Sequence, residues 1–390
     1  MLCLDKHEFT FFDKKIRLTG LIIVCIIVMI ATAAITYLVT VGSYGSRQYL
    51  ADAKQYIEIE KTIEENYIGD AEPQLLFDAA ASAMVKSIDD KWSYYMSPAE
   101  YEAYKLSSGN EYQGIGVSIE TKSDGSIIIT AVENGTPAYK AGITVGQELL
   151  SVDGQEVRDM SIEEISTLIR SKLNKDFKVT VLDDGDERSF TLSCAVIYKN
   201  PVSSRMIDDH IAYIKISNFE AGASENTTKA IERLITAGAD SFIFDVRGNP
   251  GGLVSELVSL LDYILPEGDL FVSIDKNGKE NVQRSDKVSL MNKMVVLVDE
   301  NTYSAAEFFA AALQEYNWAT VIGAHTTGKA RSQVTIELSN GGAVHISTHK
   351  YLTPDRVDLS EAGGITPDIS PESQSTGADA VLEAARKALS

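Results

Sequence analysis

The stretch Met294-Val-Val-Leu-Val-Asp-Glu-Asn-Thr-Tyr-Ser304-Ala-Ala-Glu-Phe-Phe-Ala-Ala-Ala-Leu313 decides the fold expected for the larger part of the chain. Its first five residues are apolar and end at Asp299, which is typical of a strand buried on both faces. The residues after Ser304 are rich in Ala, Leu and Phe and have the composition of a helix. Ser304 is therefore expected at the turn between a buried strand and a helix.

Two interpretations of Ser304 are open from this stretch alone. Ser304 and Glu307 have the S-x-x-E spacing of a capping box, which satisfies free amides at a helix start. The alternative is a catalytic nucleophile, which needs a base for its proton and amide donors for the oxyanion. The rest of the chain has to supply those groups if the second interpretation is right.

The composition limits the classes of protein to consider. A length of 390 residues suggests two or three domains. The net charge of -21 argues against nucleic-acid binding, because phosphate contacts need clustered Lys and Arg. Of the three cysteines, Cys3, Cys25 and Cys194, only the last belongs to the part expected to be soluble. A disulfide within that part and a Cys-based zinc site are therefore excluded, and no metal or cofactor is expected.

The amino-terminal segment predicts a membrane anchor. Residues 18–41 are almost wholly apolar and uncharged, which is enough for a membrane-spanning helix of roughly 20 residues. Residues 1–17 end in the basic cluster Lys14, Lys15 and Arg17, which by the positive-inside rule stays in the cytoplasm. We therefore expect a single-pass protein of the cell membrane, with its catalytic part on the extracytoplasmic side.

A cleaved signal peptide is the alternative for this segment. Ala31-Thr-Ala33 has the small residues of a cleavage site. The apolar run nevertheless continues to Val39 and is longer than a typical h-region. Its length favours an uncleaved anchor.

A β-rich module is expected in the middle of the chain, where short strands and turns replace a helical pattern. Gly114, Ile115, Gly116 and Val117 resemble the carboxylate-binding loop of PDZ domains. The segment 135–143 resembles the stretch that follows this loop in PDZ modules attached to proteases. Glycines let such a loop turn several amides inward, and the strand behind it can pair with the backbone of a bound peptide.

The segment that contains Ser304 alternates strands and helices and predicts an α/β core. One of its strands runs directly into Arg247-Gly-Asn-Pro-Gly-Gly-Leu253 and then into a helix. Paired glycines such as Gly251 and Gly252 at this junction allow backbone amides to face outward together and hold an oxyanion. An ordinary tight turn is the alternative.

Lys329 is the candidate base for Ser304. A lysine accepts a proton only when neutral, so burial in an apolar site has to lower its pKa. Gln333, four residues later, is placed to hydrogen-bond the amine and fix its direction, whereas a solvated surface lysine is the alternative. The segment from Gly323 to Lys329 nearly completes a nucleotide-binding P-loop. Ala330 lacks the hydroxyl that would hold magnesium, which argues against nucleotide binding.

Four motifs, together with the PDZ-like module, resemble those of the C-terminal processing peptidases, also called tail-specific proteases. In chain order they are Asp245-Val-Arg-Gly-Asn-Pro-Gly-Gly252, Ser304-Ala-Ala-Glu307, Gly328-Lys329 with Gln333, and Gly364-Ile-Thr-Pro-Asp368. The separations of 25 residues (329 - 304) and 4 residues (333 - 329) agree with the serine, lysine and glutamine spacing of that family. The resemblance covers most of the chain from about residue 50.

The resemblance implies a serine endopeptidase whose substrates are proteins or peptides with exposed C-termini. It implies Ser304 as the nucleophile, Lys329 as the general base and Gln333 as the residue that orients the lysine. The oxyanion hole would consist of the backbone amides of Gly251, Gly252 and Ala305. The core would be an α/β protease core of the ClpP/crotonase-like type.

The expected fold class is an α/β multidomain protein with an N-terminal transmembrane helix. Its expected parts are a cytoplasmic tail at 1–17, the transmembrane helix at 18–41, a helical N-terminal region at 42–110, a PDZ-like β-rich domain at 111–195, the serine protease core at 196–370 and a C-terminal helical tail at 371–390. Helices at both ends of the soluble part, including Asp379–Leu389, are candidates for a homodimer contact.

Two other functions are considered. A histidine-based triad would pair Ser304 with His325 or His349, oriented by Asp355 or Asp368. A non-catalytic anchor would capture exposed chain termini through the PDZ-like domain, but such a protein has no use for the serine, lysine and glutamine set.

Overall fold

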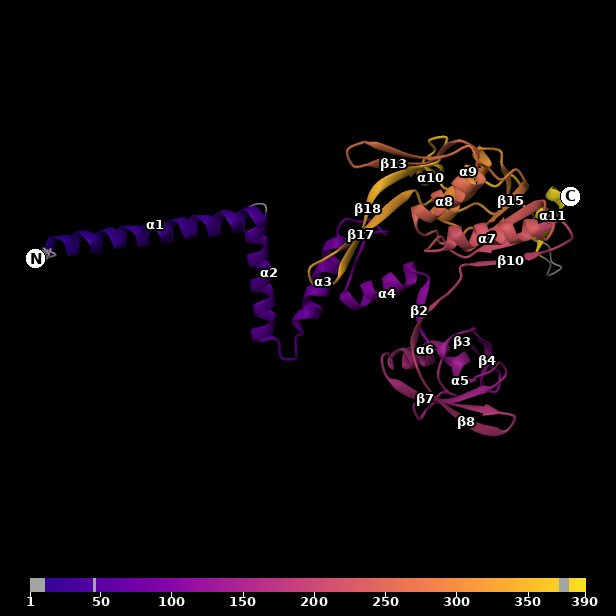
Figure 1. The fold of residues 1–390 in the computed structure, drawn as a ribbon, viewed down its shortest axis with the longest axis horizontal. Helices are drawn as coiled ribbons and strands as arrows, with labels where there is room; N and C mark the ends of the chain where they lie inside the picture. The colour runs from indigo at the N-terminus through magenta and orange to yellow at the C-terminus, as the bar shows by residue number, and fades with distance from the viewer. Residues whose placement is uncertain (1–10, 45–46, 372–378) are drawn as a thin grey trace, which may run out of the picture. The chain divides into compact units, whose positions relative to one another are not determined.

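The computed structural model describes residues 11–44, 47–371 and 379–390 (Figure 1). The chain divides into two compact units, Met1–Ala83 and Met84–Ser390. Parts of the predicted segments 1–17 and 371–390 lie outside the described residues, and so does Cys3.

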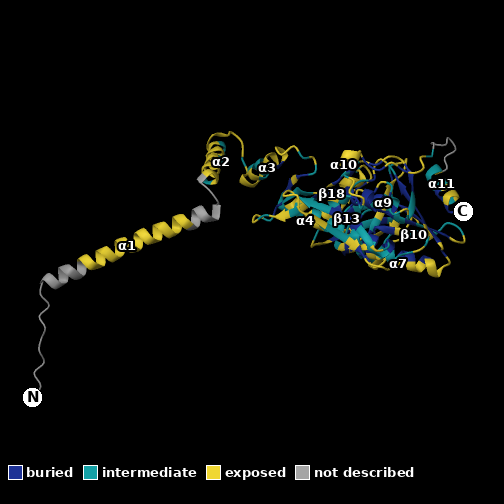
Figure 2. Cartoon of the chain, turned by 90° about the horizontal axis from the view of Figure 1, so that it is seen from above, coloured by how far each residue is buried: buried dark blue, intermediate teal, exposed yellow. Residues whose placement is uncertain are grey.

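Helices make up the described part of the first unit. They are α1 (Phe11–Tyr44), α2 (Arg47–Asn66) and most of α3 (Pro73–Lys86). Within α1, Thr19–Leu38 has a mean hydropathy of 2.8, and its described side chains are exposed (Figure 2). By length and composition this helix can cross a membrane, and a signal sequence meets the same criteria. The predicted span of 18–41 thus lies inside one longer helix.

A β-rich module follows in the second unit. Its sheet has the strand order β3-β4-β5-β7-β8, with β6 beside β5, and its core is apolar, with Ile127, Ile165 and Val179 fully buried. The predicted β-rich character of this segment is confirmed, and Gly116, at φ 84°, lies just before the first strand of this sheet. The elements are β3 (Val117–Thr121), β4 (Ile127–Val132), α5 (Pro137–Ala141), β5 (Glu148–Val152), β6 (Gln155–Glu156), α6 (Ile162–Arg170), β7 (Asp176–Asp183) and β8 (Asp186–Ser193).

A two-stranded stem carries this module. Strand β2 (Glu111–Gly114) enters it, β9 (Ala195–Tyr198) leaves it, and the two pair antiparallel from Glu111↔Tyr198 to Gly114↔Ala195. Both ends of the module therefore meet at one place in the fold.

The peptidase core is built on a five-stranded sheet with the order β10-β11-β12-β15-β16. The last four strands are parallel and β10 is an antiparallel edge strand. Their continuous apolar sequences fit strands covered on both faces. The strands are β10 (Val202–Met206), β11 (Ile211–Ile216), β12 (Ser241–Asp245), β15 (Lys293–Val298) and β16 (Ala319–Gly323).

Alternate residues of these strands serve two apolar layers. Phe242 and Phe244 face the cluster that contains α7 (Ala223–Thr236), α8 (Val254–Ile264) and α9 (Ala305–Glu315). Ile243 and Val295 face the other way, toward the helix α11 (Ala380–Leu389), so the predicted C-terminal helix is confirmed and packs on the sheet. The dark blue of α9 in Figure 2 reflects a helix that is buried from Ala305 to Leu313.

A second, antiparallel sheet was not predicted. Its order is β1-β18-β13-β14, and β17 pairs with the same strand β18. The strands are β1 (Tyr94–Met96), β13 (Gly268–Asp275), β14 (Glu280–Ser285), β17 (Arg331–Glu337) and β18 (Ala343–Leu352). Two helices complete the unit, α4 (Pro98–Ser108) and α10 (Leu359–Ala362).

The predicted helical region 42–110 therefore contains a strand. Tyr94↔His345 to Met96↔Ala343 is an antiparallel ladder, and Tyr95 and Met96 are buried. Tyr94 and Tyr95 belong to the sheet. The strand was not predicted because its partner strand lies about 250 positions later in the chain (345 - 94 = 251). Residues 84–110 accordingly group with the second unit.

Candidate active site

Two loops at the carboxyl ends of neighbouring parallel strands form the candidate site. One follows β12 and contains Gly251 and Gly252, and the other follows β15 and contains Ser304. The side chain of Thr302 donates to the carbonyl of Val246 at 3.0 Å, and the amide of Tyr303 donates to the carbonyl of Asn249 at 3.1 Å. These hydrogen bonds tie the two loops together, in the place where open α/β sheets generally bind their ligands.

A buried ion cluster fixes the start of the glycine loop. Asp245 is 1% exposed, and its carboxylate accepts from the guanidinium of Arg247 at 2.6 Å and from the hydroxyl of Tyr213 at 2.7 Å. Burial alone would raise the pKa of Asp245, but these hydrogen bonds and the Arg247 charge lower it. Arg247 also holds Asp379 at the start of α11, so the C-terminal helix is anchored beside the loop.

Gly252 has no room for a side chain. A Cβ atom there would lie 2.3 Å from the carbonyl carbon of Phe219, and its φ of 150° is outside the range that other residues favour. Phe219 clamps the loop from both sides, because its amide donates to the Gly251 carbonyl at 2.7 Å and its carbonyl accepts from Leu253 at 2.7 Å. The amide of Gly252 is left without a partner among the described residues.

Gly251 has a different role from the one predicted. Its amide donates to the side-chain oxygen of Asn249 at 2.8 Å. A Cβ atom at Gly251 would lie 2.8 Å from the amide nitrogen of Ala305, so the glycine lets the loop approach the start of α9. The amide of Ala305 has no partner within the described part of the chain. In this arrangement, Gly252 and Ala305 are the free donors of the predicted trio, and Gly251 shapes the loop.

Ser304 lies in a strained turn at the start of α9. Its φ of 59° and ψ of -130° are unusual for a residue with a side chain. The side chain is half-buried and lines a cavity of about 700 Å³. An apolar wall of this cavity consists of Leu253, Val254, Leu257, Phe271, Phe308 and Tyr351.

Glu307 holds both predicted catalytic residues by their backbones. Its fully buried carboxylate accepts from the amides of Ser304 and Lys329, each at 2.9 Å. The other carboxylate oxygen accepts from the Gly328 amide at 2.6 Å and from the Thr326 hydroxyl at 2.5 Å. The contact with Ser304 N is one half of the predicted capping box, and the remaining bonds extend it to the lysine loop.

The motif that ends at Asp368 supports the same loop. The Thr326 hydroxyl accepts from the amide of Ile365 at 2.8 Å, and Asp368 accepts from the amide of Val321 at 2.7 Å. Gly364 passes so close that a Cβ atom there would lie 2.5 Å from the Thr326 carbonyl oxygen. This motif therefore fixes the loop that carries Lys329.

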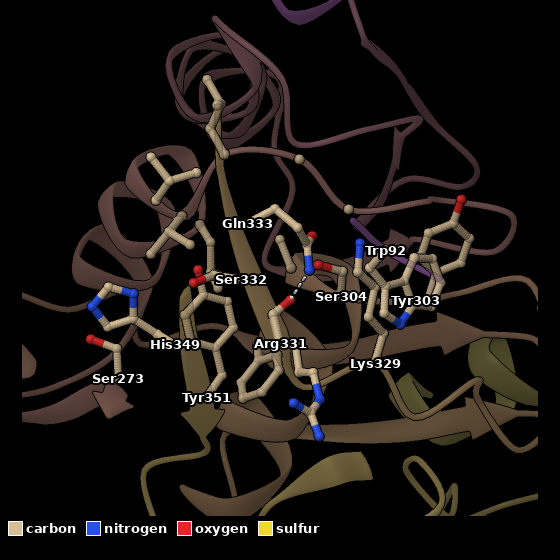
Figure 3. Close-up of a pocket in the computed structure, with 18 of the residues that line it drawn as sticks. Trp92, Ser273, Tyr303, Ser304, Lys329, Arg331, Ser332, Gln333, His349 and Tyr351 are labelled. Carbon is tan, nitrogen blue, oxygen red and sulfur yellow. Dashed lines mark hydrogen bonds between the residues drawn. The ribbon is translucent and has the colours of Figure 1, made fainter. Parts of the chain in front are cut away.

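Lys329 reaches the same cavity as Ser304, with its ammonium against aromatic rings. Its Nζ lies 4.1 Å from the ring centroid of Trp92 and 5.9 Å from that of Tyr303, as Figure 3 illustrates. Burial lowers the pKa of Lys329 and the nearby Lys91 lowers it further, whereas Asp90 and Glu307 oppose that shift. A lowered pKa is what a lysine base requires.

The chain is similar to known families and proteins in both of its main parts. The model of Peptidase family S41 matches residues 210–370, and the model of the PDZ domain matches residues 128–183. The carboxy-terminal processing protease CtpA of Bacillus subtilis (strain 168) is 30% identical over 364 residues, covering 91% of this chain and 78% of that protein. The chain belongs to peptidase family S41. It is a carboxy-terminal processing protease of the serine type with a PDZ domain.

Two further similarities agree with this family. The carboxyl-terminal-processing protease of Synechocystis sp. is 30% identical over 297 residues, covering 74% of this chain and 69% of that protein. The crystal structure of an S41 protease from Bacteroides fragilis NCTC 9343 has a TM-score of 0.52 at 16% identity and covers 80% of this chain and 89% of that one. The last similarity concerns the fold.

In this S41 peptidase, Gln333 contacts neither Ser304 nor Lys329 by a hydrogen bond. Its amide nitrogen donates to the hydroxyl of Ser347 at 3.0 Å. It also donates to the carbonyl of Arg331 at 3.1 Å, which is the dashed line in Figure 3. The side chain nevertheless lines the same cavity. The fold thus brings all three predicted side chains to one pocket, but no hydrogen bond connects them to each other among the described residues.

The histidine-based alternative receives no support from the S41 site. His325 is exposed and contacts its neighbour Thr326, while His349 lines the cavity and contacts Thr348. Within the described residues, neither ring is hydrogen-bonded to Ser304.

Three groups of this site were missed by sequence reasoning: Trp92, Asn249 and His345. Burial and the Lys329 charge lower the pKa of His345 to about 4, so that its ring is neutral beside the lysine. Trp92 lies just before β1, and His345 lies in β18. These two strands pair over a long sequence distance, so no local pattern indicated either residue. Asn249 lies in a motif that was recognised, but a role was predicted only for the glycines of that motif.

The predicted peptide-binding loop of the PDZ domain lines a second cavity, of about 780 Å³. The carbonyls of Ile115 and Gly116 accept from Ala138 and Glu133, each at 2.9 Å, and hold the loop. The amides of Ile115 and Gly116 have no partner among the described residues. Gly116, with a φ of 84°, would place a Cβ atom 2.3 Å from the side chain of Thr136. The groove is completed by α6 and α4.

Proposed function

We propose that this S41 protease is anchored in the cell membrane by α1 and cleaves extracytoplasmic proteins with a Ser304/Lys329 centre. Gln333 would orient the lysine, and the PDZ loop would receive the substrate C-terminus. The observation that carries the proposal is the buried Glu307 carboxylate, which binds the backbones of both Ser304 and Lys329. One rigid group therefore supports the nucleophile and the base together.

The reaction begins with proton transfer from the Ser304 hydroxyl to the neutral Nζ of Lys329. The serine oxygen attacks the carbonyl carbon of the substrate, and the amides of Gly252 and Ala305 donate to the resulting oxyanion. The positive end of α9 adds to this stabilisation. The protonated lysine then donates its proton to the leaving amine, and an acyl-enzyme remains.

Water completes the cycle. Lys329, neutral again, takes a proton from the attacking water. The bond between the acyl carbon and the Ser304 oxygen then breaks, Lys329 returns the proton to that oxygen, and the product leaves with a new terminal carboxyl group that ionises in water. For the first step, Lys329 has to leave the Trp92 ring and Gln333 has to exchange Ser347 for the lysine. Both side chains already line the Ser304 cavity.

The PDZ loop supplies substrate selection in this proposal. Free amides at Ile115 and Gly116 suit a terminal carboxylate, and the outer edge of β3 is available for a peptide strand, since β3 pairs with β4 alone in its sheet. The chain upstream of the terminus would then extend to Ser304. Substrates would accordingly be proteins with exposed and unstructured C-termini.

The proposed protein has a ClpP/crotonase-like core, a cytoplasmic N-terminus and a homodimer contact. The parallel sheet with catalytic loops after β12 and β15 supports a core of the ClpP/crotonase-like type, and the domain divisions at 111–195 and 196–370 follow the stem and the sheet. The basic residues before Leu18 support a cytoplasmic N-terminus. Exposed apolar side chains on α2 and α3, such as Ile59 and Leu75, support a homodimer contact in the first unit.

The full chain in detergent micelles provides the test. Ser304→Ala and Lys329→Ala are each expected to abolish cleavage of an unstructured protein. Ser332→Ala, a change at another serine of the cavity, is expected to leave the cleavage rate unchanged. Binding of an N-terminally labelled peptide with a free C-terminus should persist in all three variants and disappear when that terminus is amidated. Cleavage by Ser304→Ala at the wild-type rate would exclude Ser304 as the nucleophile.

A further inference from the structure

The amine of Lys329 is enclosed by two aromatic rings. The Nζ atom lies 4.1 Å from the centroid of Trp92 and 5.9 Å from that of Tyr303, and the two rings are 6.1 Å apart at an angle of 32°. Attraction between an ammonium and a ring face operates within about 6 Å, and Trp is the strongest partner. In Figure 3 both rings lie on the lysine side of the pocket, whereas Gln333 lies on the other side of Ser304.

Trp92 is held in this place by several contacts. The carboxylate of Asp90 accepts from the Trp92 amide at 3.1 Å and from the Ser93 hydroxyl at 2.6 Å. Ser93, which is 7% exposed, accepts in turn from the amide of Ser347 in β18 at 3.0 Å. The β1–β18 ladder begins two residues after Trp92. The backbone that carries the half-buried indole is therefore anchored in the fold.

Ser347 connects this segment to the third predicted catalytic residue. Its amide donates to Ser93, and its hydroxyl accepts from the Gln333 amide nitrogen at 3.0 Å. The same residue thus fixes the segment that carries Trp92 and holds Gln333 away from the lysine. The position of the lysine on the ring and the position of the glutamine belong to one connected arrangement.

We propose that Trp92 is a positioning residue for Lys329, whose indole face holds the ammonium and shields it from water between turnovers. The proposal rests on the role of Lys329 as the general base. An ammonium is attracted to the ring and a neutral amine is not, so deprotonation releases the side chain toward Ser304. Shielding from water acts in the opposite sense to this attraction, because it disfavours the charged form. Burial is the largest influence on the pKa of Lys329, which is lowered.

Other charges around the amine have to be taken into account. The segment before β1 contributes Asp90 and Lys91, α9 contributes Glu307, and His345 faces it from β18. His345 is neutral at physiological pH because its pKa is about 4, so it does not titrate in the range of interest. Asp90 and Glu307 favour the ammonium.

The first test measures kcat and KM of the full chain in detergent against pH. Trp92→Ala admits water to the amine, so we expect kcat at pH 7 to fall about tenfold, with the acidic limb moved up by about one pH unit and KM changed less than about threefold. Trp92→Phe keeps a ring and is expected to restore most of the rate. The matched control is Trp318→Phe, because Trp318 lies outside the site and donates to the Leu290 carbonyl. An unmoved acidic limb in a folded Trp92→Ala protein would overturn the proposal.

A fluorescence titration tests the contact without relying on Trp92→Ala being folded. The chain has two tryptophans, so Trp318→Phe leaves Trp92 as the sole emitter. Its emission is expected to follow the ionisation of Lys329, with a single transition that disappears when Lys329→Met is added. The same transition in both proteins, or none in either, would contradict the contact. If Lys329→Ala still cleaved substrate, the proposed general base would fail, while the titration would still report on the ring and the amine.

Discussion

Replacing Glu307 by Gln tests whether one buried carboxylate organises the catalytic pair. The carboxylate accepts four hydrogen bonds, from Ser304 N, Lys329 N, Gly328 N and Thr326 Oγ1. Glutamine has the same shape, but its amide nitrogen cannot accept. Two of the four donors therefore lose their acceptor and face another donor.

The size of the effect follows from these contacts. Two hydrogen bonds to a charged group, at about 1.5–3 kcal/mol each, give about 3–6 kcal/mol. Relief from burying a carboxylate reduces the net loss of stability to about 2–4 kcal/mol. The thermal midpoint of the second unit is then expected to fall by about 5–10 °C. Displacement of Ser304 and Lys329 by a fraction of an ångström is expected to lower kcat about 100-fold, with little change in KM.

The assay combines thermal unfolding of the full chain with steady-state cleavage of an unstructured substrate below the unfolding transition. Glu300→Gln is the matched control, because Glu300 is exposed in the same turn and its side chain makes no hydrogen bond to a described residue. A Glu307→Gln protein with a wild-type midpoint and a kcat within about threefold of wild type would refute the reasoning. Loss of stability without loss of kcat at low temperature would show that Glu307 supports the fold but not the site.

Three further outcomes are expected. Gly252→Ala places a Cβ atom 2.3 Å from the carbonyl carbon of Phe219, so cleavage should fall at least 100-fold, as a peptide turnover assay would show. Gly116→Ala collides with Thr136 at 2.3 Å and should weaken peptide binding at least tenfold in a polarisation assay, while turnover of a short peptide is unchanged. Burial and a neighbouring carboxylate raise the pKa of Glu220 to about 7, above its value in the unfolded chain, so its burial costs stability as pH rises from about 4.5 to 7. Glu220→Gln should therefore raise the thermal midpoint at pH 8 but not at pH 4.

Much of the peptidase core could be predicted from the sequence. The strand that ends before Asp299 and the helix after Ser304 occur where they were expected, because a buried parallel strand reads as a continuous apolar run. The glycine loop after β12 was also recognisable as a candidate from its paired glycines at a strand-to-helix junction, although an ordinary tight turn was an open alternative. That Ser304 and Lys329 meet in one site could be expected only because their spacing resembles that of the family.

The rest depended on contacts that no local pattern reveals. Trp92 could not be connected with Lys329 from the sequence, because the two residues lie 237 positions apart (329 - 92). The S-x-x-E spacing predicted only the hydrogen bond between Glu307 and the Ser304 amide. The other three, from Thr326, Gly328 and Lys329, had no signal in the sequence. The amide of Gly251 was assigned to the oxyanion hole, whereas the side chain of Asn249 occupies it. In each case a side-chain contact in the folded chain decides the role.

The pairing of β1 with β18 has a consequence for the order in which this enzyme is made. The paired residues Tyr94 and His345 are 251 positions apart (345 - 94), so the pairing is one of the last contacts available to a growing chain. Until β18 has left the ribosome, neither the indole segment nor the hydroxyl of Ser347 has its anchor. On the proposed mechanism, a nascent chain therefore carries Ser304 without the surroundings that would make Lys329 a base. Proteolytic activity is then expected only after nearly all of the polypeptide has been synthesised, which would protect the incomplete chain and its neighbours from premature cleavage.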